Sequence, residues 1–234
     1  MKPRPINAKP PKAIEEANEQ SSLRVFANET EESMEILVYD RIGEDFWTGE
    51  GVRAKDVQAI MATAKGKPVH VRINSFGGDV YDGFQIYNAL ASHDAEVRAT
   101  VEGIAFSAAS FIAMAGDTLA MYRTSDFGIH EASTVAIGNK REMKSAYDWL
   151  ATIDEHLLDI YTAKTGKDRE WMNQMLTGES DGTVFSAEEA KEHGFADEIV
   201  DPKTEKSDGK KDKAASAARQ LSNRFRNRLR KAAS

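Results

Sequence analysis

The segment Gly103–Gly116, GIAFSAASFIAMAG, decides how this chain is organised, because it sets one serine among residues that are almost all small or apolar. Small or apolar side chains recur at steps of three and four from Phe106 through Ala109 to Ala113, and this spacing predicts a buried helix that begins near Ser107. Backbone N–H groups in the first turn of a helix have no partner within the helix. Ser107 therefore suits one of two roles: an N-cap that accepts from these groups, or a nucleophile whose oxyanion they stabilise.

The composition is that of one globular domain with tails, since the 234 residues are 41% hydrophobic and 29% charged. There is no cysteine, which excludes disulfides, thiolate zinc sites and a cysteine nucleophile. The formal net charge of −7 argues against nucleic acid as the main partner. No apolar run is long enough to cross a membrane, and the first residues lack the apolar core of a signal peptide. We therefore expect a cytoplasmic protein with no membrane partner, no metal and no cofactor.

Three regions differ in composition. Residues 1–22 hold four of the six prolines and almost no bulky apolar residues, which predicts a disordered N-terminal arm. Residues 23–201 carry the regular patterns and form the predicted domain. Residues 202–234 are a charged linker followed by a basic stretch, which we interpret as a solvated tail; docking to scaffold or capsid protein is the alternative.

Strand and helix patterns alternate along the predicted domain. Period-two alternation predicts strands at 23–28, 34–40, 69–74, 97–103 and 117–122, and helical spacing predicts helices at 54–65 and 80–90. Strands that alternate with helices through short connections indicate a mostly parallel sheet with crossover helices.

A second informative segment is NSFGGDVYDGF, in which Gly77 and Gly78 join a predicted strand to a predicted helix. Adjacent glycines let backbone N–H groups approach a ligand that any Cβ would block. The pair can therefore form a donor turn beside a reacting group, although an ordinary strand-to-helix turn has the same sequence.

His130 is the candidate general base among the five histidines. It follows a strand and a glycine, and loops at strand ends commonly carry catalytic groups. The other histidines, His70, His93, His156 and His193, have surface explanations as strand or helix residues in polar contexts.

A long amphipathic helix is predicted at 140–166, with apolar residues at steps of three and four and a charged opposite face. We expect its apolar stripe to be only partly covered by its own sheet and to form an interface; simple packing on its own sheet is the alternative. The stripe consists of Met143, Tyr147, Leu150, Ile153, Leu157 and Tyr161.

Four segments together carry a family resemblance: INSFGGDVYDGFQIYNAL, EGIAFSAASFIAMAGD, GIH and VFSAEEAKEHGFADEIV. In order and spacing they resemble the proteolytic subunit of the Clp protease, and most closely the Clp-like head maturation proteases of tailed phages and prophages. The resemblance covers about residues 23–200. It implies an α/β fold, the spiral of strand-strand-helix units shared with crotonases, with a long projecting handle helix.

The resemblance also implies a site. It makes Ser107 the nucleophile and His130 the general base, and it makes the amides of Gly78 and Ala108 the oxyanion donors, with Gly77 shaping the donor turn. The residues 133–139 before the long helix would lie beside the substrate.

The third member of the implied triad is an acid before the VFSAEEA motif. The family's spacing, counted back from Ser186, lands on Gly182. We assign Asp181 on the assumption of a one-residue bulge, with Glu179 as the alternative. An ordinary Asp-Gly turn would give the same residues.

The implied function is that of a ring-forming homo-oligomeric serine endopeptidase that cleaves scaffold and major capsid proteins during phage head maturation. One alternative is a general protein-degrading subunit; because the chain has no Walker-type phosphate-binding loop, its unfoldase ATPase would be a separate chain. Another is a crotonase-like or catalytically silent assembly protein, because a fold alone fixes no chemistry.

Overall fold

A computed structural model of the chain describes residues 25–30, 32–45, 50–178 and 181–201. The predicted arm at 1–22, the predicted tail at 202–234 and the alternative acid Glu179 lie outside the described residues. The division into arm, domain and tail therefore stays a prediction.

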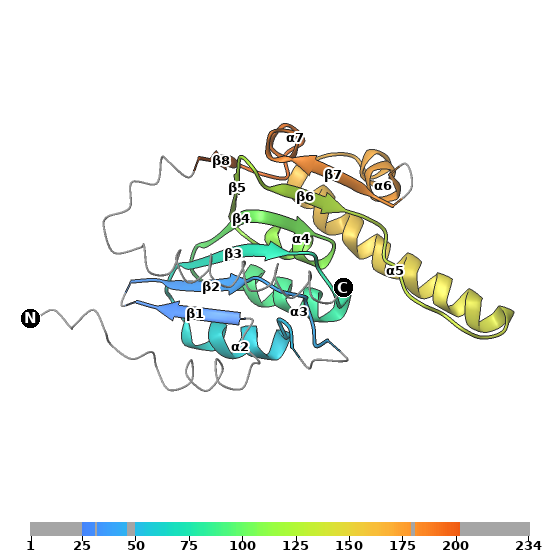
Figure 1. Cartoon of the computed structure of the whole chain (residues 1–234), viewed down its shortest axis with the longest axis horizontal. Coiled ribbons are helices and arrows are strands. Elements are labelled where there is room, and N and C mark those ends of the chain that lie inside the picture. The colour runs from blue at the N-terminus through green and yellow to red at the C-terminus, as the bar shows by residue number, and fades with distance from the viewer. Residues whose placement is uncertain (1–24, 31, 46–49, 179–180, 202–234) are drawn as a thin grey trace, which may run out of the picture. The chain divides into compact units, whose positions relative to one another are not determined.

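One mixed sheet forms the centre of the described structure (Figure 1). Its strands are β1 Val25–Glu29, β2 Met34–Val38, β3 Val69–Ser75, β4 Val97–Phe106, β5 Thr118–Tyr122, β6 Asp126–Ile129, β7 Thr183–Ser186 and β8 Glu198–Val200. The order is β1-β2-β3-β4-β5-β8, with β6 paired to β4 and β7 paired to β6. Strands β2 to β6 and β8 pair in parallel, whereas β1 and β7 are antiparallel to their neighbours. The predicted α/β class with a mostly parallel sheet is confirmed.

The helices are α2 Ala54–Thr63, α3 Val80–Ala91, α4 Ala108–Ala113, α5 Lys140–Thr165, α6 Arg169–Thr177 and α7 Ala187–Glu192. Helices α2, α3 and α4 pack on one face of the sheet (Figure 1). Residues Val69, Val71 and Ile73 of β3 alternate into this core as predicted, because successive side chains of a strand point to opposite faces. None of the helices in the described ranges is long and apolar enough to cross a membrane.

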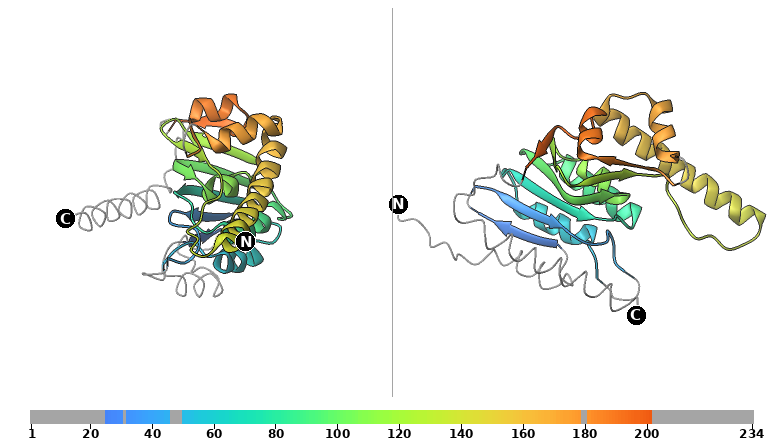
Figure 2. Two further views of the ribbon diagram at one scale, coloured as in Figure 1. Left: turned by 90° about the vertical axis from the view of Figure 1, so that its right-hand side faces the viewer. Right: turned by 45° about the horizontal axis from the view of Figure 1, so that its top comes forward.

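Helix α5 has two different halves. Figure 1 and the right-hand view of Figure 2 show its first half projecting beyond the sheet. Met143 is 37% exposed and Tyr147 is 71% exposed in this half. In the second half, Leu157 and Tyr161 are buried in the core of the same subunit, at 4% and 1% exposure. The predicted interface stripe is therefore wrong for these two residues and for Ile153, which is 2% exposed, because the core of their own subunit already covers them.

Candidate active site

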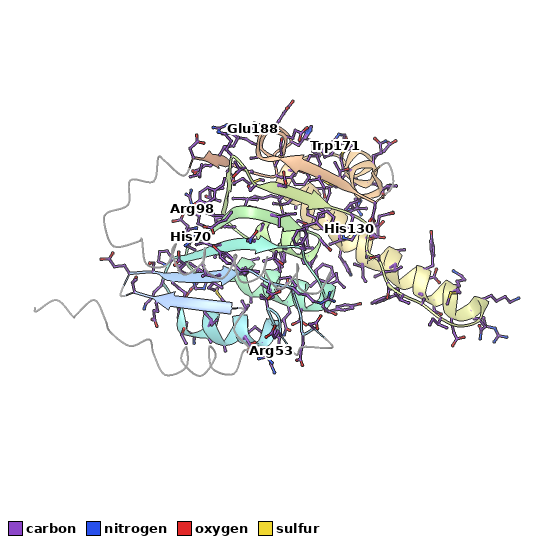
Figure 3. The ribbon with its side chains drawn as sticks, viewed as in Figure 1. Arg53, His70, Arg98, His130, Trp171 and Glu188 are labelled. Carbon is purple, nitrogen blue, oxygen red and sulfur yellow. The ribbon has the colours of Figure 1, made fainter. Side chains whose placement is uncertain are left out.

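Three neighbouring parallel strands end at the same edge of the sheet. Strand β4 lies between β3 and β6, and all three run in the same direction. The donor turn at Gly77 follows β3, Ser107 follows β4 and His130 follows β6. Figure 3 shows His130 at the end of β6, beside α5. The fold thus brings together the three predicted components at the carboxyl ends of parallel strands, where sites of α/β proteins commonly lie.

Ser107 occupies a strained turn between β4 and α4. Its backbone has φ 56° and ψ −128°, and it is the one non-glycine residue with positive φ in the described part of the chain. Its side chain makes no capping hydrogen bond to α4. Ser107 is thus the N-cap residue of α4 by position, but its hydroxyl does not accept from the N–H groups of the first turn. A strained strand-to-helix turn that carries a serine with no capping hydrogen bond is typical of a nucleophile.

The neighbouring hydroxyl, Ser110, has a structural role. It is fully buried, and its Oγ donates to the Ser107 carbonyl at 2.6 Å and lies 2.7 Å from the Tyr161 hydroxyl of α5. These contacts attach the short helix α4 to α5. Burial also raises the pKa of Tyr161 above its ordinary value, so this hydroxyl stays neutral.

The Gly77–Gly78 turn lies directly against the nucleophile turn. A Cβ on Gly77 would lie 2.6 Å from the Ser107 Cβ and 2.7 Å from the Ala108 nitrogen, and the φ of Gly77 is +86°. Only glycine permits this approach without strain.

The same turn leaves an amide free. Ile42 N donates to Gly77 O at 2.9 Å and Asp79 N donates to Ile42 O at 2.8 Å, so the bridging residue Gly78 directs its own N–H away from Ile42. Within the described residues, neither the Gly78 amide nor the Ala108 amide makes a hydrogen bond. Both are available to an oxyanion formed at Ser107.

His130 is half-buried at the end of β6. Its ring stacks on Phe106, with 5.2 Å between ring centroids and 13° between the planes. Its Nδ1 is buried, and in the part of the chain that the structure describes it has no hydrogen-bond partner. The structure contains no hydrogen bond between Ser107 Oγ and this ring, and catalytic hydrogen bonds commonly tighten only when substrate is bound.

The predicted acid, Asp181, is exposed and makes no hydrogen bond to His130. Strand β7 pairs with β6 so that Thr183 lies opposite Ile129, and this register places Gly182 opposite His130. A Cβ on Gly182 would overlap the His130 Cβ and the Ile129 carbonyl. The assignment of Asp181 stays a prediction. The residue opposite His130 is Gly182, just before β7, and it has no side chain.

Sequence reasoning missed a second carboxylate beside His130. Asp154, on the buried half of α5, accepts a hydrogen bond from the Ala132 amide at 2.7 Å. Burial raises the pKa of Asp154, against the opposing effects of the Ala132 hydrogen bond and the His130 charge, while the Glu131 charge raises it further. No sequence pattern indicates this contact, since Asp154 is one of several acids on an amphipathic helix. Among the described residues no group of side chains is suited to hold a metal ion.

Comparison with known proteins agrees with this fold. The model of the Clp protease family matches residues 26–203 of the chain. Among solved structures, a mutant of ClpP1 from Listeria monocytogenes is similar, with a TM-score of 0.61 and 21% sequence identity. That match covers 71% of this chain and 91% of the other. At this identity the structural likeness establishes the fold, which is the predicted one.

Proposed function

Because the chain belongs to the Clp protease family, a family of serine-type peptidases, we propose that it is a serine endopeptidase whose nucleophile is Ser107. The observation that carries the proposal is the strained backbone of Ser107, whose side chain caps no helix N–H group. Next to it lie the amides of Gly78 and Ala108, which make no hydrogen bond among the described residues. A nucleophile and its oxyanion donors require this combination, whereas a structural serine does not.

The chemistry follows from the positions of these groups. Ser107 Oγ attacks the scissile carbonyl carbon while His130 Nε2 takes the hydroxyl proton. The amides of Gly78 and Ala108 donate to the oxyanion of the tetrahedral intermediate. His130 then gives its proton to the leaving amine, and water hydrolyses the acyl-enzyme by the same steps in reverse. Each oxyanion donor contributes about 3 kcal/mol of transition-state stabilisation in such sites.

We also propose that the enzyme acts as a ring-forming homo-oligomer in the host cytoplasm. Large apolar side chains that follow His130 in sequence are exposed, which supports an assembly that covers them. These side chains are Val135 at 90%, Ile137 at 91%, Met143 at 37% and Tyr147 at 71% exposure.

The proposed role is phage head maturation, with scaffold and major capsid proteins as substrates. It is supported by the resemblance of the NSFGGD, AFSAAS and FSAEEA motifs to Clp-like head maturation proteases. The second candidate is general protein degradation with a separate ATPase; it is favoured by the same family membership.

A fluorophosphonate probe tests the chemistry. We expect the probe to label wild type and not Ser107→Ala, because the substitution removes only the reactive oxygen. Ser110→Ala is the matched control and should be labelled, since Ser110 is buried and engaged with Tyr161. Labelling of folded Ser107→Ala, or none of wild type, would contradict the assignment and favour a silent assembly protein.

The role is tested separately with purified substrates. Scaffold and capsid proteins encoded beside the gene should be cut at discrete sites by wild type without ATP. If these proteins remain intact while unfolded casein is degraded only with an added unfoldase ATPase, the degradative role replaces the proposed one.

A further inference from the structure

His130 lacks the partner that a general base of this kind needs. In a Ser-His pair the imidazole must keep its proton on Nδ1, so that Nε2 is free to accept the serine proton. An acceptor beside Nδ1 enforces that tautomer. In this structure Nδ1 is buried and has no hydrogen-bond partner among the described residues. A buried polar group without a partner is unusual and requires an explanation.

The turn before β7 does not supply the acceptor. Gly182 stands opposite His130 and has no side chain, and its φ of +89° makes any other residue there strained. Asp181, one residue earlier, is exposed, and the structure gives it no hydrogen bond or ion pair with His130.

Helix α5 supplies a carboxylate from the other side. Asp154 Oδ1 accepts from the Ala132 amide, two residues after His130, at 2.7 Å. Its second oxygen makes no hydrogen bond with the described residues. The carboxylate is partly buried, and its contact with the His130 loop runs through the Ala132 amide; in this structure it makes no direct hydrogen bond or ion pair with the His130 ring. Asp154 is thus held next to the loop that follows His130, and its second oxygen remains available to accept a hydrogen bond.

We propose that Asp154 is the positioning carboxylate of His130, in the part that the sequence assigns to Asp181. The inference rests on the proposed function, because it takes His130 as the general base. Oδ1 fixes the loop through the Ala132 amide, and Oδ2 accepts a hydrogen bond from Nδ1–H when substrate engages the site. The charge also stabilises the imidazolium that forms during proton transfer. Asp154 contacts no substrate atom and acts only through His130.

Among the described residues, the other acids near the pair are less well placed for this part. Glu131 follows His130 on the same loop but is exposed, and Glu155 is exposed and paired with Arg169. The opposite face of the imidazole is covered by the Phe106 ring.

The decisive variant is Asp154→Asn. Its amide oxygen can still accept from Ala132, so the loop should remain attached, but the amide nitrogen would face Nδ1 as a donor. A donor there favours the wrong tautomer, and the equivalent change in a serine protease triad lowers kcat about 10⁴-fold. We expect kcat on a fluorogenic peptide to fall between about 10²-fold and 10⁴-fold, with KM changed less than about threefold. Asp154→Glu, which keeps the charge, should recover part of the activity.

Two controls separate this role from simpler ones. Asp181→Asn tests the competing assignment: if Asp154 takes this part, the Asp181 variant should lower kcat much less than Asp154→Asn does. Asp159→Asn removes another acid of α5, one paired with Arg169 on the surface, and should retain wild-type kcat. Full activity of Asp154→Asn, or severe loss in Asp181→Asn alone, would overturn the proposal. So would a loss in Asp154→Asn that accompanies a lower melting temperature and is equal in Asp154→Glu, because that pattern indicates a purely structural contact.

A readout independent of activity keeps the two hypotheses distinguishable. Nitrogen-15 NMR of the ring should show the Nδ1–H tautomer of His130 in wild type and a shift toward the Nε2–H tautomer in Asp154→Asn. If wild type fails to react with a fluorophosphonate, the proposed function fails, yet the tautomer still reports whether Asp154 orients His130. An unchanged tautomer in Asp154→Asn would refute the inference even if Ser107 is the nucleophile.

Discussion

The ring of Phe106 lies nearly parallel to the imidazole of His130, with 5.2 Å between their centroids. Phe106 immediately precedes the nucleophile, and it occupies the space above Gly128, where a Cβ would overlap the aromatic ring. The residue before Ser107 thereby fixes the plane of the base. Strands β4 and β6 carry the two groups in register, with Phe106 opposite Gly128.

This stack predicts an effect of Phe106→Leu. The substitution keeps an apolar side chain but removes the flat surface, and an aromatic pair contributes about 0.5–1.5 kcal/mol beyond burial. If the stack orients the base, kcat should fall about threefold to tenfold with little change in KM. Phe106→Tyr keeps the flat ring and is the matched control. Steady-state kinetics decide; equal kcat in wild type and Phe106→Leu would show that the stack does not orient His130.

The donor turn predicts a larger effect at Gly77. A Cβ there would press on the Ser107 Cβ and the Ala108 nitrogen, so Gly77→Ala should separate the donor turn from the nucleophile. We expect kcat to fall about 10²-fold to 10³-fold, as when an oxyanion donor is lost.

Gly66→Ala controls for backbone strain in this experiment. Gly66 has a similar φ of +71° but nothing within 4 Å of its would-be Cβ. Both variants bear the cost of a non-glycine residue at positive φ, yet only Gly77→Ala disturbs the site. Comparable kcat in the two variants would rule out the contact as the cause.

Assembly through the projecting half of α5 predicts a shift in particle size. Met143→Glu with Tyr147→Glu places charges on exposed positions of this half and should leave the subunit folded. We expect smaller particles by sedimentation and a parallel loss of peptidase activity. Fully active monomers, or unaltered large particles, would contradict the coupling of assembly to activity.

Leu157 is buried in its own subunit, so a substitution there tests the stability of the fold and not assembly. Because Leu157 is 4% exposed within its own subunit, Leu157→Ala should lower the free energy of unfolding by about 2–5 kcal/mol. Chemical denaturation measures it. A cost near zero would mean that the packing around α5 differs from the one described.

Asp154 predicts a pH dependence of stability. Its pKa is raised by burial, so the folded state holds this proton more tightly than the unfolded chain does. Its contribution to stability is therefore greatest below the unfolded pKa of about 3.9 and is lost as pH rises through the folded pKa. Relative to wild type, Asp154→Asn should gain stability across that acidic range and keep the gain at neutral pH. Urea unfolding of both proteins at several pH values measures the difference; a constant difference would show that the carboxyl does not titrate differently on folding.

Regular patterns allowed much of the fold to be predicted. The alternation of Val69, Val71 and Ile73 predicted β3, because period two corresponds to one buried face of a strand. Helix α6 was missed, since its buried residues are only Met172 and Leu176 in a polar segment. A single pair four residues apart is too short a pattern to indicate a helix.

Some residues of the candidate site could likewise be predicted from the sequence and others could not. Ser107 and His130 were predicted because each follows a strand within a short motif. Asp154 was not, because its contact with Ala132 depends on how α5 packs beside β6. The covering of Leu157 could not be predicted either, since an apolar stripe looks the same whether its own sheet or a second subunit buries it.

Helix α5 runs without interruption from Lys140 to Thr165, so at 1.5 Å per residue it is a rod about 39 Å long. One end is clamped in the core at Leu157, and the free end carries Tyr147. Asp154 lies between these two residues, one turn before the buried Leu157. A tilt of the projecting half against a partner would change the angle at which Asp154 meets the loop after His130. Packing on a surface far from Ser107 would in this way affect the position of the catalytic base.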